Sequence, residues 1–91
     1  GNVYRDISEL GLALADYTRA IELDPTYAPT YNSRGNIYRN LGHDRPAIAD
    51  YTHAIELDST YLSAYNNRAN AYRSVGDAAA AVADYTRVLE L

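Results

Sequence analysis

The chain lacks several residue types on which protein chemistry often depends. Its 91 residues include no cysteine, which excludes a disulfide framework and a thiolate metal site. They also include no lysine, methionine, phenylalanine or tryptophan, so all eight basic residues are arginine and all ten aromatic residues are tyrosine. No apolar run reaches the length of a membrane span, and no signal-peptide pattern opens the chain. We therefore expect no membrane partner and favour a cytoplasmic location, and the net charge of −4 argues against nucleic acid as a partner.

The sequence repeats itself with a period of 34 residues. The string Ala-Asp-Tyr-Thr occurs at residues 15–18, 49–52 and 83–86. Residues 13–46 align with residues 47–80 with 19 identities in 34 pairs. The chain therefore holds two full periods and part of a third, a pattern typical of stacked structural repeats.

Each period contains two helical patterns. In the first, Tyr31, Gly35 and Tyr38 share one helix face at i, i+4 and i+7. In the second, small and apolar residues recur every three to four positions, and polar residues lie off that stripe. These spacings predict first helices over residues 1–7, 28–41 and 62–75, and second helices over 45–57 and 78–91.

The expected helix ends carry recognisable signals. Gly42 and Gly76 stand where a helix C-terminus is expected. Asp44 is a plausible N-cap for the helix that follows, with Pro46 in its first turn. Ser8 lies one period before Gly42 and replaces the turn glycine there.

Small and large residues recur in separate columns. Alternating small and large columns let neighbouring helices interdigitate at core density. We therefore interpret the tyrosines as core residues whose hydroxyl groups reach the surface or a carbonyl group. The small columns are Ala13, Ala47 and Ala81, then Ala20 and Ala54, and the large columns are Tyr17, Tyr51 and Tyr85, then Tyr4, Tyr38 and Tyr72.

These columns resemble the tetratricopeptide repeat family over the whole chain. The resemblance rests on the 34-residue period, the aromatic, glycine and alanine columns, and Pro25 between repeats. The departures are Ser59 for the interrepeat proline, Val88 for a small alanine, and arginine at positions 34 and 68, where the family usually carries leucine. The resemblance implies an all-α superhelix of antiparallel helix pairs with about 2.7 repeats, in which the first helix of each pair lines a concave wall that binds extended peptides or single helices.

The repeat phase divides the chain into a partial repeat over residues 1–27, a repeat over 28–61 and a truncated repeat over 62–91, all in one array. The last second-type helix carries Val82, Tyr85 and Leu89 on a face with nothing after it to cover it. We expect a fragment of a longer array whose two ends associate with each other between molecules.

Charge separates between the two helix types. The expected first helices carry five arginines against one acidic residue, and the rest of the chain carries three arginines against eleven acidic residues. Asparagines run in columns along the first helices beside the apolar face. Amides and guanidinium groups suit the backbone and the carboxylates of a peptide. We predict a groove for an extended, acidic peptide or a partner helix, lined by Asn32, Asn36, Arg39, Asn66, Asn70 and Arg73. The alternative is that the asparagines lie on an ordinary solvated surface.

The arginines at positions 34 and 68 lie beside the core stripe, where a charge requires a partner. Asp16, Asp50 and Asp84 recur in register on the second helices, so we expect structural ion pairs, with ligand binding as the alternative.

Some modules of this family grip chaperone C-terminal carboxylates with Lys, Asn and Arg at particular groove columns. Asn2 and Asn36 match one such asparagine column. However, Asn67 stands where an arginine is needed and Ser63 where a lysine is needed. The resemblance therefore disfavours chaperone-tail binding.

Other functions have less support. His43 and His53 are the only histidines, and no phosphate-binding glycine loop, metal-spaced cluster or nucleophile–base pair is visible. We expect no enzyme activity, no cofactor and no metal site. A structural, self-assembling array segment and an RNA-binding helical repeat remain as alternatives, the second less favoured because of the acidic balance.

Overall fold

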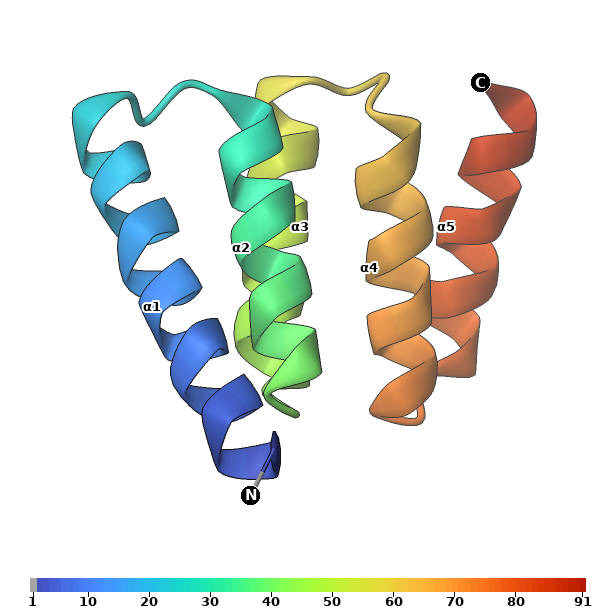
Figure 1. Cartoon of the computed structure of the whole chain (residues 1–91). Coiled ribbons are helices and arrows are strands. Elements are labelled where there is room, and N and C mark those ends of the chain that lie inside the picture. Colours follow the sequence, from blue (N-terminus) through green and yellow to red (C-terminus); the bar gives the residue numbers. More distant parts are fainter. Residues whose placement is uncertain (1) are drawn as a thin grey trace.

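The computed structural model describes the backbone of residues 2–91 and the side chains of residues 9–91. Five α-helices and no strand are present in this part of the chain (Figure 1). The helices are α1 (Asn2–Leu23), α2 (Ala28–Asn40), α3 (Asp44–Leu57), α4 (Leu62–Ser74) and α5 (Ala78–Glu90). The predicted all-α fold is confirmed, and the boundaries of α2 to α5 agree with the expected ones to within one residue.

The helices alternate in direction and form two antiparallel pairs, α2 with α3 and α4 with α5 (Figure 1). The two pairs pack through α3 and α4, and α1 packs on α2. Helices α2 and α4 also contact each other, whereas no such contact joins α1 to α3 or α3 to α5 among the described residues. The first-type helices α2 and α4 therefore form the inner wall of the curved array.

Glycine at the end of each first-type helix produces the tight turn within a pair. Gly42 and Gly76 have φ values of 81° and 83°, which a side chain would strain. The backbone N–H of Gly42 donates to Arg39 O at 2.9 Å, and that of His43 donates to Tyr38 O at 2.8 Å. The same two bonds recur one repeat later around Gly76. This is the Schellman motif, which satisfies carbonyl groups at the helix end.

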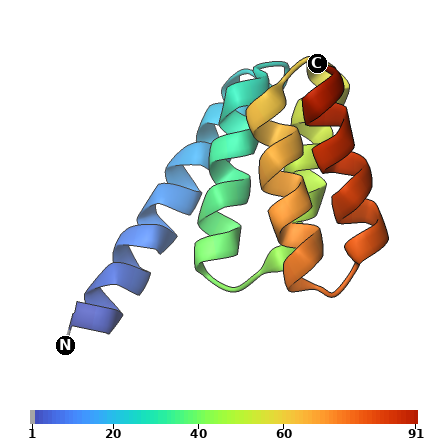
Figure 2. The same cartoon turned by 90° about the vertical axis from the view of Figure 1, so that its right-hand side faces the viewer.

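The prediction of a short helix over residues 1–7 is wrong, because α1 runs without a break from Asn2 to Leu23. Figure 2 shows its N-terminal half leaning away from the other helices. The turn is missing where Ser8 takes the place of the glycine, and an L-residue disfavours the left-handed backbone that the turn requires. Tyr4 and Asn2, which we placed in repeat columns, lie outside the residues whose side chains are described.

The prediction of an N-cap at Asp44 also needs correction. Asp44 is the first residue of α3, the N-cap is His43, and no described side chain caps this helix. In the next repeat, Asp77 occupies the corresponding position and its carboxylate accepts a bond from Ala80 N at 3.1 Å. Asp44 lies one residue after the N-cap, in the first turn of α3, where its carboxylate interacts favourably with the helix dipole.

The loop between repeats is held by the same contacts in both copies. The Asp24 carboxylate accepts bonds from the backbone N–H and the hydroxyl of Thr26, and Asp58 accepts the same two bonds from Thr60. The Tyr31 hydroxyl donates to Pro25 O at 2.8 Å, as Tyr65 does to the carbonyl of residue 59. These bonds end one repeat and orient the next.

The core follows the small and large columns. Tyr51 is completely buried between α2 and α4, and a methyl group added at Gly35 would lie 2.7 Å from its ring. Position 35 therefore needs glycine, because the fully buried ring of Tyr51 cannot move aside, whereas Ala69 is accommodated at the equivalent position one repeat later. Tyr17, Tyr38, Tyr72 and Tyr85 are only half-buried. Two clusters make up the core, one of Ala28, Tyr31, Ala54, Ile55, Ala64 and Tyr65 and the other of Ala47, Tyr51 and Ala71.

The outer face of α5 repeats the face of α3 that packs on α4, but none of the described residues covers it. Leu89 is 87% exposed, whereas Ile55, its equivalent one repeat earlier, is 9% exposed. Val82 is 62% exposed, whereas its equivalent Ile48 is half-buried. At the other end of the array, α1 exposes Leu12.

Candidate functional site

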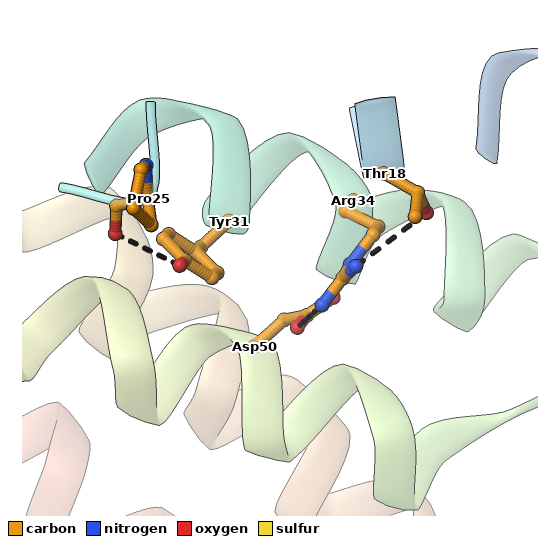
Figure 3. Close-up of polar contacts among 5 residues, drawn as sticks. All are labelled: Thr18, Pro25, Tyr31, Arg34 and Asp50. Atoms are coloured by element: carbon orange, nitrogen blue, oxygen red, sulfur yellow. Dashed lines mark hydrogen bonds and ion pairs between the residues drawn. The ribbon is translucent and has the colours of Figure 1, made fainter. Parts of the chain in front are cut away.

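A half-buried arginine joins three helices at two equivalent places in the array, at positions 34 and 68. Arg34 of α2 donates to both carboxylate oxygens of Asp50 in α3, at 2.8 and 2.7 Å (Figure 3). It also donates to the Thr18 hydroxyl of α1 at 3.4 Å. One repeat later, Arg68 makes the same three bonds, to Asp84 of α5 at 2.8 and 2.7 Å and to the threonine hydroxyl at position 52 at 3.2 Å. We call each such set an arginine clip.

The clips are structural, as expected for two of the three aspartates. Asp50 and Asp84 are each 5% exposed and have an arginine partner. Hydrogen bonding to these carboxylates raises the pKa of Arg34 and of Arg68 against the opposing effect of burial, so both guanidinium groups stay charged. Asp16, the third member of the column, is exposed and has no arginine against it among residues 9–91.

Three of the predicted groove residues surround one pocket on the inner wall. Arg39 at the end of α2 and Asn70 and Arg73 in α4 line a pocket of about 330 Å³ together with Ser74. No carboxylate of the described side chains lines it. Ser74 was not among the predicted groove residues, although its position one residue after Arg73 could have indicated it.

Two of the predicted groove asparagines, Asn36 and Asn70, are bonded to tyrosine hydroxyl groups. Asn36 accepts a bond from the Tyr51 hydroxyl at 2.5 Å, and Asn70 accepts one from the Tyr85 hydroxyl. Both tyrosines belong to second-type helices, so their hydroxyl groups reach the inner wall from behind. Repeat columns identify helix faces but not such contacts between faces, so the sequence analysis did not predict them.

The two remaining predicted groove residues, Asn32 and Asn66, differ in exposure. Asn32 is 8% exposed, and its side-chain oxygen accepts a bond from Asn67 of the next repeat at 3.1 Å. This bond joins α2 to α4, so Asn32 is a residue of the repeat interface. Asn66 is exposed to solvent. The structure thus groups Arg39, Asn70 and Arg73 and leaves Asn66 apart from their pocket.

The electrostatic environment of the Tyr51 hydroxyl connects it to Arg39. Burial raises the pKa of Tyr51, and interaction with the Arg39 guanidinium partly opposes this rise. The Tyr51 hydroxyl is therefore influenced by Arg39, which lines the pocket, and bonded to Asn36.

A second pocket, of about 440 Å³, lies where the start of α3 meets the turn between α4 and α5. It has one charge of each sign, from Arg45 and Asp77, so it does not select an ionic ligand. This pocket was not predictable from the repeat columns, because its lining comes from two repeats and a turn. The other lining residues are Ile48, Tyr72, Val75 and Gly76.

The histidines pack on tyrosine rings. The His53 ring stacks on that of Tyr31, with centroids 4.2 Å apart and planes 6° from parallel. Within the described part of the chain, no group of three metal-ligating side chains gathers. No described helix is both long enough and apolar enough to cross a bilayer.

Comparison with known proteins agrees with this geometry. Models of the family described as "TPR repeat" match residues 1–42 and 35–76, and a model described as "Tetratricopeptide repeat" matches residues 62–91. A comparison with curated proteins gave no match.

Several solved structures share the fold. The first TPR of Spaghetti (RPAP3), bound to the HSP90 peptide SRMEEVD, is 30% identical with a TM-score of 0.89, over 99% of this chain and 71% of that one. MamA is 30% identical with a TM-score of 0.88, over 99% of this chain and 53% of that one. A thermophilic TPR protein of Thermus thermophilus is 32% identical with a TM-score of 0.89, over 96% of this chain and 44% of that one.

The paired helices, the 34-residue columns and the matching family models define a helical-repeat solenoid. The chain belongs to the tetratricopeptide repeat family. The family and its peptide-bound neighbours support a role as a protein-interaction scaffold.

Proposed function

We propose that the inner wall of this array binds an extended, acidic peptide segment of a partner protein. Arg39 and Arg73, one from each first-type helix, line the same pocket with Asn70 and without a carboxylate from the described side chains, and this observation carries the proposal. The arginines of the clips are already neutralised by aspartates, so these two remain to meet a ligand charge. Two guanidinium groups beside amide donors suit carboxylates of the ligand.

The test is removal of the two groove charges. We expect Arg39→Gln combined with Arg73→Gln to weaken binding of a fluorescent glutamate-containing peptide by roughly ten-fold or more, measured by fluorescence anisotropy. Arg19→Gln is the matched control, because Arg19 is exposed on α1 and lies outside the pocket. Equal affinities in the double variant and the control would refute the proposal.

We also propose that the partner differs from a chaperone tail. RPAP3 modules bind the HSP90 peptide SRMEEVD, but here Ser63 and Asn67 occupy the columns in which such clamps carry lysine and arginine. The unmodified chain should therefore bind SRMEEVD more weakly than it binds its own acidic partner segment. Introducing Ser63→Lys and Asn67→Arg together should strengthen SRMEEVD binding in the same anisotropy assay.

A second candidate function is self-assembly through the ends of the array. The exposure of Val82 and Leu89 on α5, and of Leu12 on α1, favours it. We propose that the outer face of α5 in one copy packs against α1 of another, which is a head-to-tail contact.

Sedimentation velocity tests this assembly. Val82→Glu with Leu89→Glu should give monomers, and so should Leu12→Glu. A mixture of the two variants retains one intact junction and should give dimers but nothing larger. A wild-type chain that stays monomeric at high concentration would exclude self-assembly. Catalysis and RNA binding have no observation in their favour among the described residues, and we propose neither.

A further inference from the structure

The hydrogen bonds between tyrosine and asparagine fix which way the asparagine amides face on the inner wall. The sequence columns do not reveal this orientation. A free asparagine side chain offers both an acceptor oxygen and a donor NH₂ group. In Asn36 and Asn70 the oxygen accepts a bond from a tyrosine hydroxyl of the helix behind. The NH₂ group of each is then the part that remains for a ligand.

The bond at Asn36 has a defined direction. A phenolic hydroxyl has a single hydrogen, and the Tyr51 hydroxyl donates it to the side-chain oxygen of Asn36. Only the oxygen of the amide can accept that hydrogen, so this contact fixes the orientation of Asn36.

The second repeat places the same groups in register. Tyr85, Asn70 and Arg73 stand 34 residues after Tyr51, Asn36 and Arg39, and the hydroxyl of Tyr85 donates to Asn70. Two amide NH₂ groups and two guanidinium groups thus form a stripe of hydrogen-bond donors along α2 and α4. Asn32 adds no acceptor to this stripe, because it is buried and its oxygen faces Asn67.

We propose that Tyr51 and Tyr85 are specificity-determining positioning residues, which hold Asn36 and Asn70 with their oxygens turned away so that the groove selects carboxylates over carboxamides. This inference rests on the proposed peptide-binding function. A carboxylate has acceptors only and carries charge, so it satisfies a donor stripe completely. If the ligand carried glutamine instead of glutamate, the NH₂ group of that glutamine would face the donors of the groove unless its amide turned over. Without the tyrosine hydroxyl groups, the asparagines could turn to accept from that NH₂ group.

The test compares two fluorescent peptides that differ only in carrying two glutamates or two glutamines at the same positions. We expect the wild-type chain to prefer the glutamate peptide by roughly ten-fold or more. Tyr85→Phe removes one hydroxyl from a half-buried ring, so it should fold normally, and it should narrow this preference by about three-fold or more. Tyr51→Phe should act in the same direction. Tyr27→Phe, on an exposed tyrosine between the repeats, is the matched control and should leave the preference unchanged.

A second variant tests the same selectivity by replacing a donor of the groove with an acceptor. Asn70→Asp can still accept from Tyr85 but turns an acceptor toward the groove. It should weaken binding of the glutamate peptide far more than binding of the glutamine peptide. A structural role alone would weaken both peptides equally.

The outcomes separate the inference from the proposed function. Suppose that the glutamate peptide binds, but that Tyr85→Phe and Tyr51→Phe prefer it over the glutamine peptide as strongly as the wild type does. The inference is then overturned while the proposed function stands. If neither peptide binds to the wild-type chain, both are overturned. A narrowed preference in the tyrosine variants, absent in Tyr27→Phe, supports the inference.

Discussion

At the scale of single residues, the arginine clip is the chemical departure of this chain from its family. The family usually carries leucine where Arg34 and Arg68 lie. An arginine there requires a carboxylate, which Asp50 and Asp84 supply. The clip was predictable because arginine and aspartate recur together at the same spacing of 34 residues. The tyrosine hydroxyl bonds were not predictable, because they depend on how far a side chain reaches between helices.

Replacing one clip arginine should destabilise the protein strongly. Arg34→Leu restores the usual residue of the family but leaves the Asp50 carboxylate buried without its partner. We expect a loss of about 3 kcal/mol in the free energy of unfolding, measured by urea denaturation. Adding Asp50→Leu removes the unpaired charge and should recover much of this loss. A single variant as stable as the wild type would show that the pair contributes nothing.

Tyr51 should make the protein sensitive to alkaline pH. Burial raises its pKa in the folded state above the ordinary 10.0, so the unfolded chain releases this proton first. Its contribution to stability is therefore present below the unfolded pKa and is lost as the pH rises toward the folded one. Between about pH 9 and about pH 11, the free energy of unfolding should fall more steeply in the wild type than in Tyr51→Phe. Parallel slopes would contradict this assignment.

At the scale of helices, one turn residue decides whether the chain forms a pair or a single helix. Gly42 and Gly76 end their helices with a positive φ, and Ser8 in the same column does not. The sequence columns placed α2 to α5 correctly because each end carries its own signal. They failed at α1 because our prediction relied on the similarity of its first residues to α2 and gave too little weight to the missing glycine at position 8.

Restoring the signal should restore the turn. Ser8→Gly with Glu9→Asp reproduces the Gly76–Asp77 pair that ends α4 and caps α5. We expect NMR chemical shifts to show a helix break at residues 8 and 9 in this variant. Ser8→Ala, a better helix former, should keep α1 continuous. An unbroken α1 in the glycine variant would mean that residues beyond the turn hold the helix straight.

At the scale of the whole molecule, each repeat is stabilised by its neighbours. Tyr51 is fully buried because α2 and α4 flank it, whereas Tyr85 has only one such neighbour among the described helices and is half-buried. Asn32 and Asn67 add a polar link between the same two helices. Stability in such an array is approximately a sum over repeats and the interfaces between them.

Covering α5 should therefore stabilise the chain. A copy of residues 58–74 appended after Leu91 continues the 34-residue period and places a second α4 against Val82 and Leu89. We expect the free energy of unfolding to rise by about 2 kcal/mol, measured by urea denaturation. An appended segment of the same composition in shuffled order serves as control. Equal stability of the two extended chains would show that the α5 face does not accept a repeat helix.

The clips also bear on how such arrays exchange parts during evolution or engineering. Each clip takes its arginine and aspartate from one helix pair and its threonine from the helix that precedes that pair, as Thr18 of α1 serves Arg34. A helix pair transplanted alone into an ordinary array would leave its threonine behind. The cassette that can be moved intact is therefore offset from the repeat, beginning in one second-type helix and ending in the next.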